Sequence, residues 1–108
     1  FSVIRDFIGH GIGKEMHEDP QVPHYGVKGR GRRLIENMVI TIEPMVNIGT
    51  WKMRLEDNNW VARTRDGKNS CQFEHTLVVK KGKADILTNQ DDYKLDDEDL
   101  NWIKNYKF

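Results

Sequence analysis

The segment "IGHGIGKEMHEDP", residues 8–20, places three glycines, two histidines and three acidic residues within thirteen positions. Imidazoles and carboxylates bind divalent metals or move protons. A phosphate-binding loop with its lysine at Lys14 would need glycine at position 8 and a hydroxyl at position 15, where the chain has Ile8 and Glu15. A dinucleotide-binding fingerprint starting at Gly9 would need glycine at position 14, where the chain has Lys14. Both phosphate-binding motifs are therefore excluded.

The zinc-protease motif H-E-x-x-H also fails. It begins at His17 and Glu18 but reaches Gln21 where the second histidine is needed. Pro20 would break the helix that puts both imidazoles on one face. None of the three motifs therefore explains this segment.

Two glutamates interrupt apolar segments that otherwise have strand character: Glu43 in "TIEPMV" and Glu74 in "CQFEHTLVV". Each carboxylate either faces water, which is the ordinary case, or enters the interior, where an uncompensated charge is costly. Histidine with carboxylates is a donor set that divalent cations prefer. Two such glutamates, together with a histidine between glycines at His10, favour a divalent-metal site.

The composition is that of one small, polar globular domain. The chain has 108 residues, 37% of them hydrophobic and 31% charged, and a mean hydropathy of -0.74. Seventeen basic and seventeen acidic residues cancel, so the charge favours neither a nucleic-acid nor a membrane partner. The single Cys71 and the lack of a long apolar segment predict a cytoplasmic protein. We expect Cys71 to be a buried small hydrophobe and not a nucleophile.

The pattern predicts a mostly antiparallel β body. The expected elements are a strand over 2–8 leading into a turn at 9–13, a loop over 14–33, a strand over 38–47 that Pro44 ends or bulges, and hairpins over 51–67 and 71–88. The hairpin turns are expected at Asn58-Asn59 and Lys81-Gly82. The basic group at 28–33 is interleaved with glycines and lacks an aromatic platform, so we interpret it as a solvated loop and not as a nucleic-acid patch.

The end of the chain is different in character. Residues 91–108 hold three basic and six acidic residues, and 96–106 place acids before apolar residues at helical spacing. We predict an acidic tail over 89–108 with a short terminal helix, which makes the fold class α+β. The chain begins at Phe1 inside an apolar segment, which we interpret as a sign that it is a piece of a longer protein.

Four blocks of sequence, in this order, carry a resemblance to a known family: "GHGIG…HEDPQVPHYG", "MVITIEPMVN", "NNWVART" and "QFEHTLVV". From Phe1 to about Thr88 the chain resembles the C-terminal half of type I methionine aminopeptidases. The resemblance implies that 1–88 form the second half of a pita-bread catalytic domain of the creatinase/aminopeptidase type. The N-terminal half, with two aspartate ligands and another histidine, is not in this sequence, so the chain is expected to be inactive alone.

The resemblance also implies roles for single residues. It makes His10, Glu43 and Glu74 ligands of two divalent ions, which could be Co, Mn, Fe or Zn. Glu74 would bridge the ions, and Glu43 would also move a proton. The glycines at 9, 11 and 13 would keep bulk away from metal and substrate.

The implied substrate is a peptide or nascent chain with N-terminal methionine, cleaved after that residue. His17 would contact its amide, and Trp60 and Met16 would line the pocket for the methionine side chain. Met16 departs from the aromatic residue usual in the family, and neither His24 nor His75 has an implied role. Two alternatives stay open: a non-catalytic interaction module on the same fold, and a proline-specific aminopeptidase relative.

Overall fold

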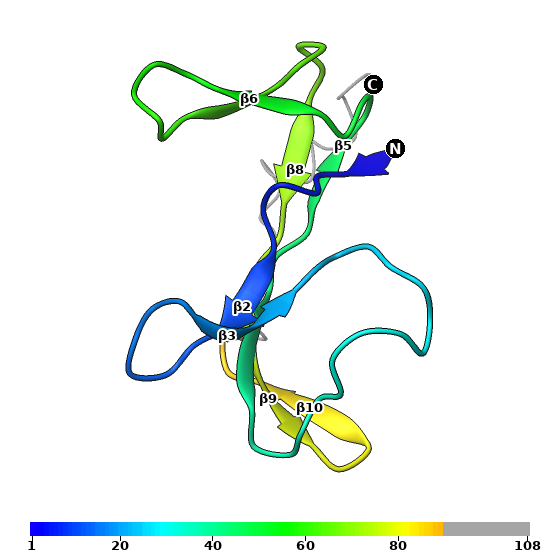
Figure 1. Ribbon diagram of the computed structural model, residues 1–108, viewed down its shortest axis with the longest axis vertical. Helices are drawn as coiled ribbons and strands as arrows, with labels where there is room; N and C mark the ends of the chain where they lie inside the picture. The colour runs from blue at the N-terminus through cyan, green and yellow to red at the C-terminus, as the bar shows by residue number, and fades with distance from the viewer. Residues whose placement is uncertain (90–108) are drawn as a thin grey trace, which may run out of the picture.

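The computed structural model describes residues 1–89, which form ten β-strands and contain no helix. The strands are β1 (Ser2–Val3), β2 (Gly9–Gly11), β3 (Glu18–Val22), β4 (Val39–Ile42), β5 (Met45–Asn47), β6 (Met53–Leu55), β7 (Ala62–Thr64), β8 (Ser70–Gln72), β9 (His75–Lys80) and β10 (Lys83–Ile86). They form a five-stranded sheet in the order β10-β9-β4-β2-β3, a three-stranded sheet in the order β1-β5-β8, and the separate hairpin β6-β7 (Figure 1). All strand pairs are antiparallel.

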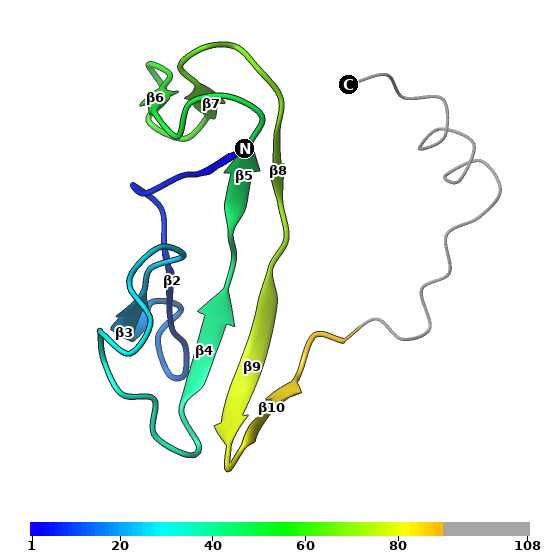
Figure 2. The same cartoon turned by 90° about the vertical axis from the view of Figure 1, so that its right-hand side faces the viewer.

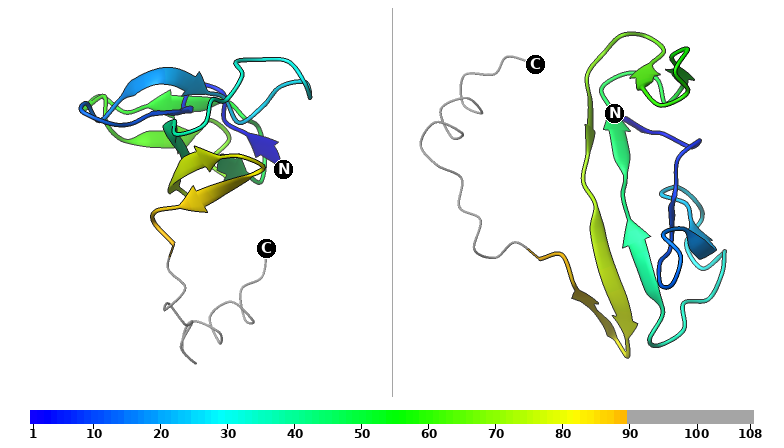
Figure 3. Two further views of the ribbon diagram at one scale, coloured as in Figure 1. Left: turned by 90° about the horizontal axis from the view of Figure 1, so that it is seen from below. Right: turned by 90° about the vertical axis from the view of Figure 1, so that its left-hand side faces the viewer.

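One long two-stranded ribbon connects the two sheets. Strands β4 and β5 follow each other along one side of it, and β9 and β8 along the other (Figure 2). Ile42 lies opposite His75, and Met45 lies opposite Gln72. The chain thus advances by three residues on each side between these two pairs. The register is therefore the same on both sides of the break at Glu43 and Pro44. Views from below and from the other side show the N-terminus lying at the β5 end of this ribbon (Figure 3).

The proline accounts for the break. Pro44 has no N–H to donate to a ladder, but its carbonyl oxygen still accepts a hydrogen bond of 3.4 Å from the N–H of Phe73. The ribbon is thus weakened at this point but not interrupted. The prediction of a strand over 38–47 that Pro44 ends or bulges is confirmed.

Few side chains are fully buried among the described residues. Fully buried are Ile40, Thr41 and Asn47, and the apolar Ile4 and Leu77 keep 5% and 8% of their surface exposed. Ile40 lies opposite Leu77 across β4 and β9, so the five-stranded sheet has its small apolar centre beside the buried hydroxyl of Thr41. Interior polar groups need hydrogen-bond partners, and those of Thr41 belong to the candidate site described below.

The two predicted hairpins are confirmed, with turns between β6 and β7 and between β9 and β10. Asn59 and Gly82 have φ values of 54° and 75°, the left-handed conformation that asparagine and glycine adopt most readily in turns. Local turn chemistry was a sufficient signal here.

Three expectations about the first third of the chain are wrong. Of the strand expected over 2–8, only Ser2–Val3 (β1) is a strand. The glycine segment expected as a turn at 9–13 contains β2, and the loop expected over 14–33 contains β3. A β-carbon on Gly9 would lie 2.3 Å from the carbonyl oxygen of Thr41, and one on Gly11 would lie 2.1 Å from that of Asp19. These two glycines therefore allow neighbouring strands to approach β2 closely, a role other than the expected clearance for metal and substrate.

Cys71 is exposed on β8, an edge strand whose three positions are all exposed, so the prediction of a buried cysteine is wrong. The mostly antiparallel β architecture is confirmed. The helix over 96–106 and nearly all of the acidic tail lie outside the described residues, and the α+β label depends on them. Within residues 1–89, the structure contains no helix of the length and apolarity that crossing a membrane requires.

Candidate metal centre

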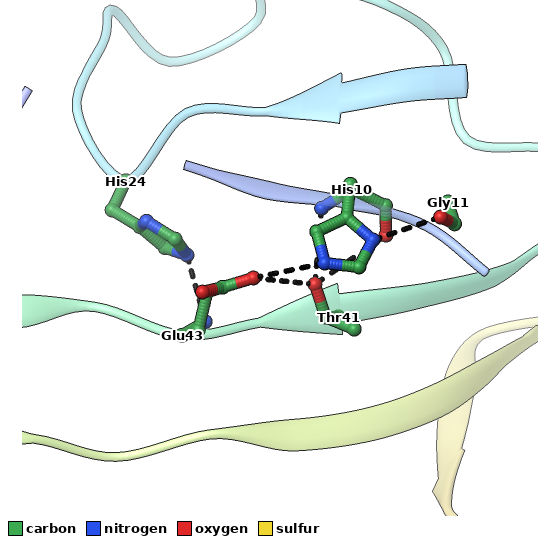
Figure 4. A network of polar contacts seen from close by, with 5 residues as sticks. All are labelled: His10, Gly11, His24, Thr41 and Glu43. Atoms are coloured by element: carbon green, nitrogen blue, oxygen red, sulfur yellow. Dashed lines mark hydrogen bonds and ion pairs between the residues drawn. The ribbon is translucent and has the colours of Figure 1, made fainter. Parts of the chain in front are cut away.

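His10 lies in the middle of β2 with its side chain toward β4. Its Nδ1 lies 2.9 Å from the carbonyl oxygen of Gly11. Because a carbonyl oxygen can only accept, Nδ1 carries the hydrogen, and in a neutral imidazole the lone pair is on Nε2. Nε2 lies 3.4 Å from Oε1 of Glu43 (Figure 4). This is the arrangement in which metal-binding histidines are usually held, with one nitrogen bonded to the protein and the other free to ligate.

The hydroxyl of Thr41 connects His10 to Glu43. It accepts a hydrogen bond of 3.0 Å from the backbone N–H of His10 and donates one of 2.9 Å to Oε1 of Glu43. Thr41 is only 1% exposed, so its hydroxyl is fixed by the fold. The carboxylate oxygen that faces His10 is therefore held in place from β4 itself.

His24 holds the other end of the same glutamate. The backbone N–H of Glu43 donates a hydrogen bond of 2.9 Å to Nε2 of His24, so Nδ1 carries the proton of the neutral ring. Within the described part of the chain, Nδ1 is buried and has no hydrogen-bond partner. Burial lowers the pKa of His24 from its ordinary value of 6.5, and the nearby charge of Glu43 opposes this shift. The neutral form is the one that can accept the N–H of Glu43.

His17 comes from the loop between β2 and β3 and packs on His10. The two ring centroids lie 4.3 Å apart, and the planes are tilted by 54°. Unlike His10, the side chain of His17 is exposed. The two histidines of the opening segment thus lie together, one half-buried against Glu43 and one toward solvent.

Glu74 occupies the position opposite Glu43 in the ribbon, because the register is the same on both sides of the break. Residues directly opposite in an antiparallel pair share one face of the sheet. Glu74 is nevertheless exposed, and no three His, Cys, Asp or Glu side chains gather into a metal site within residues 1–89. The structure therefore brings His10 and Glu43 together. It places Glu74 at the position opposite Glu43, but the three side chains do not converge on one point.

Comparison with known proteins agrees with this geometry. The sequence model of metallopeptidase family M24 matches residues 1–81. The chain belongs to metallopeptidase family M24. Methionine aminopeptidase A of Synechocystis sp. is 58% identical to this M24 chain over 88 residues, which are 82% of the chain and 35% of that protein. Methionine aminopeptidase 1 of Bacillus subtilis is 49% identical over 88 residues, which cover 82% and 36%.

The solved structures that this chain resembles are also methionine aminopeptidases. The crystal structure of methionine aminopeptidase from Thermotoga maritima has a TM-score of 0.78 and 46% identity, covering 82% of the M24 chain and 35% of its own. That from Rickettsia prowazekii has a TM-score of 0.79 and 44% identity, with coverage of 82% and 36%. The chain thus spans about a third of the length of the relatives it matches.

The residues of this M24 chain fit part of a divalent-metal site. The lone pair of His10 Nε2 and the carboxylate of Glu43 face each other, and Glu74 adds a third donor of the right chemistry at the facing position. Within residues 1–89, these donors do not gather into a group of three. The described residues therefore offer part of a donor set that suits a divalent metal, and the family supports divalent-metal use.

The two residues expected to line a methionine pocket are both exposed. Met16 is 72% exposed in the β2–β3 loop, and Trp60 is 86% exposed at the turn between β6 and β7. That hairpin lies at the end of the ribbon opposite β10 (Figure 2). Their role in binding the methionine side chain stays a prediction.

Sequence reasoning missed Thr41 and His24. Thr41 precedes Glu43 by two positions, and the alternation of a strand puts both on one face, so the signal was present. His24 is separated from Glu43 by nineteen positions. No spacing rule connects the two residues, and only the fold reveals the contact.

Proposed function

We propose that residues 1–88 are the C-terminal half of the pita-bread catalytic domain of a methionine aminopeptidase, which removes N-terminal methionine from peptides and nascent proteins. The observation that carries this proposal is the pair formed by His10 Nε2 and Glu43 Oε1 at 3.4 Å. It lies in a chain that is 58% identical, over 88 residues, to a protein named methionine aminopeptidase A.

In the complete protein, His10, Glu43 and Glu74 would hold two divalent ions, of which Co, Mn, Fe and Zn are candidates. Such ions polarise a carbonyl and lower the pKa of bound water from about 15.7 toward neutrality. The donors of this chain suit that task because the carbonyl oxygen of Gly11, beside Nδ1 of His10, favours the tautomer that leaves the Nε2 lone pair for a metal.

The protein's own groups then move protons and orient the substrate. Glu43 is the base beside the reacting water, and the hydroxyl of Thr41 orients its carboxylate through the bond to Oε1. His17 packs on His10 and is exposed, so its imidazole is available to donate a hydrogen bond to the scissile amide. Met16 and Trp60 would contact the methionine side chain once the rest of the domain covers them.

The proposal includes the N-terminal half of the domain as partner, a substrate with N-terminal methionine, and a cytoplasmic location. The location is consistent with the single cysteine of the sequence.

The test is a chimera in which residues 1–88 replace the matching segment of the Synechocystis enzyme, to which they are 58% identical. The chimera should release methionine from a Met-Ala peptide in the presence of Co²⁺ or Mn²⁺ and leave an Ala-Pro peptide intact. The 108-residue chain should release none. Cleavage of Ala-Pro alone would indicate the proline-specific relative. No cleavage of either peptide by a folded chimera would indicate a non-catalytic module, and full activity of the monomeric chain alone would refute a shared site.

A further inference from the structure

The backbone around Glu43 lacks the support that a strand interior normally gives. Glu43 follows β4 directly and precedes Pro44, which cannot donate a hydrogen bond. On the other side, β2 pairs with β4 in the register Gly11 opposite Ile40, and continuing that register would put Ile8, before the start of β2, opposite Glu43. A break of this kind leaves an amide without a ladder partner, and such groups need one.

His24 supplies that partner. Its Nε2 accepts the Glu43 N–H at 2.9 Å, so an imidazole takes the place of the missing neighbouring strand. The same glutamate is held at its carboxylate by Thr41 at 2.9 Å. With its main chain and its carboxylate both bonded, Glu43 has little freedom to move relative to His10.

The segment that carries His24 is itself anchored. The next residue, Tyr25, lies with its ring 5.4 Å from the guanidinium carbon of Arg5, and that carbon also lies 4.7 Å from the ring of Trp51. Contacts of a guanidinium with aromatic rings at such distances are favourable. They tie the loop after β3 to segments near both β1 and β5, which gives His24 a defined position.

We propose that His24 is a positioning residue: by accepting the Glu43 N–H, it fixes the Glu43 carboxylate opposite the imidazole of His10. This inference rests on the proposed function for its effect on peptide cleavage, but the geometric part concerns this chain alone. Outer-shell partners of this kind typically change metal affinity by about 10–100-fold.

Two amide variants test whether an acceptor atom is needed at the position of His24 Nε2. In His24→Gln the side-chain amide extends to about the position of Nε2, whereas in His24→Asn it extends only to that of Nδ1. We expect His24→Gln to keep Co²⁺ affinity within about threefold and His24→Asn to weaken it about tenfold or more in the chimera, measured by titration calorimetry. Without metal, hydrogen exchange at the Glu43 amide should be faster in His24→Asn only.

His75 provides the matched control. It is the first residue of β9, it bonds to Thr88, and it lies opposite Ile42 and not Glu43. His75→Asn should leave Co²⁺ affinity and Glu43 exchange unchanged. Equal Co²⁺ affinity and equal Glu43 exchange in both His24 variants would overturn the proposal, as would an equal loss in His75→Asn.

The outcomes separate this inference from the proposed function. If the chimera binds Co²⁺ with the expected dependence on His24 but releases no methionine, the positioning role stands and the peptidase assignment fails. If the chimera is active and kcat, KM and Co²⁺ affinity are all insensitive to His24→Asn, the assignment stands and the positioning role fails. For an active chimera we expect the loss in kcat, at saturating Co²⁺, with KM nearly unchanged.

Discussion

The site around His10 and the hairpin β6-β7 are both held by polar contacts, but the contacting residues are far apart in the sequence at the site and close together in the hairpin. At the site, hydrogen bonds join residues separated by 19 positions, His24 and Glu43, or by 31 positions, His10 and Thr41. In the hairpin, Asn58 accepts from residues two and three positions ahead, Trp60 and Val61.

Exposure follows the same division. His10 and Glu43 are 16% and 14% exposed, whereas Arg63 and Glu56, which pair within the hairpin, are 59% and 34% exposed. Ion pairs at the surface contribute little to stability. The hairpin can thus form from its own sequence, while the site forms only when distant segments meet. Substitutions at the site should therefore have larger and longer-ranged effects than those in the hairpin.

The largest effect is expected for Glu74→Ala in the chimera. Removing a carboxylate proposed to bridge two ions should abolish metal loading and with it methionine release. Metal content after gel filtration, measured by atomic emission, checks this. Glu56→Ala in the hairpin is the control and should retain metal, and a fully loaded Glu74→Ala protein would remove Glu74 from the ligand set.

The second effect concerns Gly11→Ala. The new β-carbon would lie 2.1 Å from the carbonyl oxygen of Asp19, and a backbone atom cannot move away by changing rotamer. We expect a loss of about 3 kcal/mol in the free energy of unfolding, together with loss of the β2-β3 pairing.

Denaturant unfolding of the chimera measures this loss. Gly82→Asn is the comparison in a hairpin, since asparagine tolerates the φ of 75° found there. It should cost less than about 1 kcal/mol. A similar loss of unfolding free energy for both variants would mean that the close approach of β3 to Gly11 does not explain the effect of Gly11→Ala.

The third effect separates binding from turnover. His17→Ala should lower kcat about 100-fold, because it removes a donor to the scissile amide, while metal content stays unchanged. Kinetics with a Met-Ala peptide, set beside metal analysis of the same sample, decide this. Loss of metal would instead make His17 a ligand.

The smallest effect is expected at Asp66, next to the hairpin. Its carboxylate accepts hydrogen bonds from the backbone N–H groups of Thr50 and Lys68, and these bonds lower the pKa of Asp66 from its ordinary value of 3.8. A depressed pKa in the folded state means that the stabilisation is present above pH 3.8 and is lost as the pH falls further.

The protection of the β6 and β7 amides, relative to the exchange rate of an unfolded chain at the same pH, should therefore fall in acid for the unmodified chain. In Asp66→Asn it should already be lower at neutral pH. Co²⁺ affinity at neutral pH should not change in this variant. A change in that affinity would show that the hairpin and the metal centre are coupled.

The same difference between local and long-range contacts decides what could be predicted from the sequence. The turns at Asn58-Asn59 and Lys81-Gly82 and the break at Pro44 depend on local conformation, and all three were predicted correctly. Strand β3 was missed because its sequence, "EDPQV", is polar and contains a proline, and it is a strand only through its pairing with β2. Cys71 was predicted to be buried because the sequence does not reveal that β8 lies at a sheet edge.

The site was predicted in part for the same reason. The glutamates were visible because a charge in an apolar strand is unusual, and His10 because glycines flank it. That His10 meets Glu43 is a property of the fold, and so is the bond to His24, which had no sequence signal at all.

The unchanged register of the ribbon constrains how related chains can vary in length. Adding one residue within 39–47 alone would shift one side of the ribbon against the other, and Glu43 and Glu74 would no longer be opposite each other. Adding residues at the β6-β7 turn changes no pairing on either side, because that turn lies in the segment that joins the two sides of the ribbon. Insertions and deletions in relatives should therefore concentrate at that turn, and a length change in one side of the ribbon should be matched in the other.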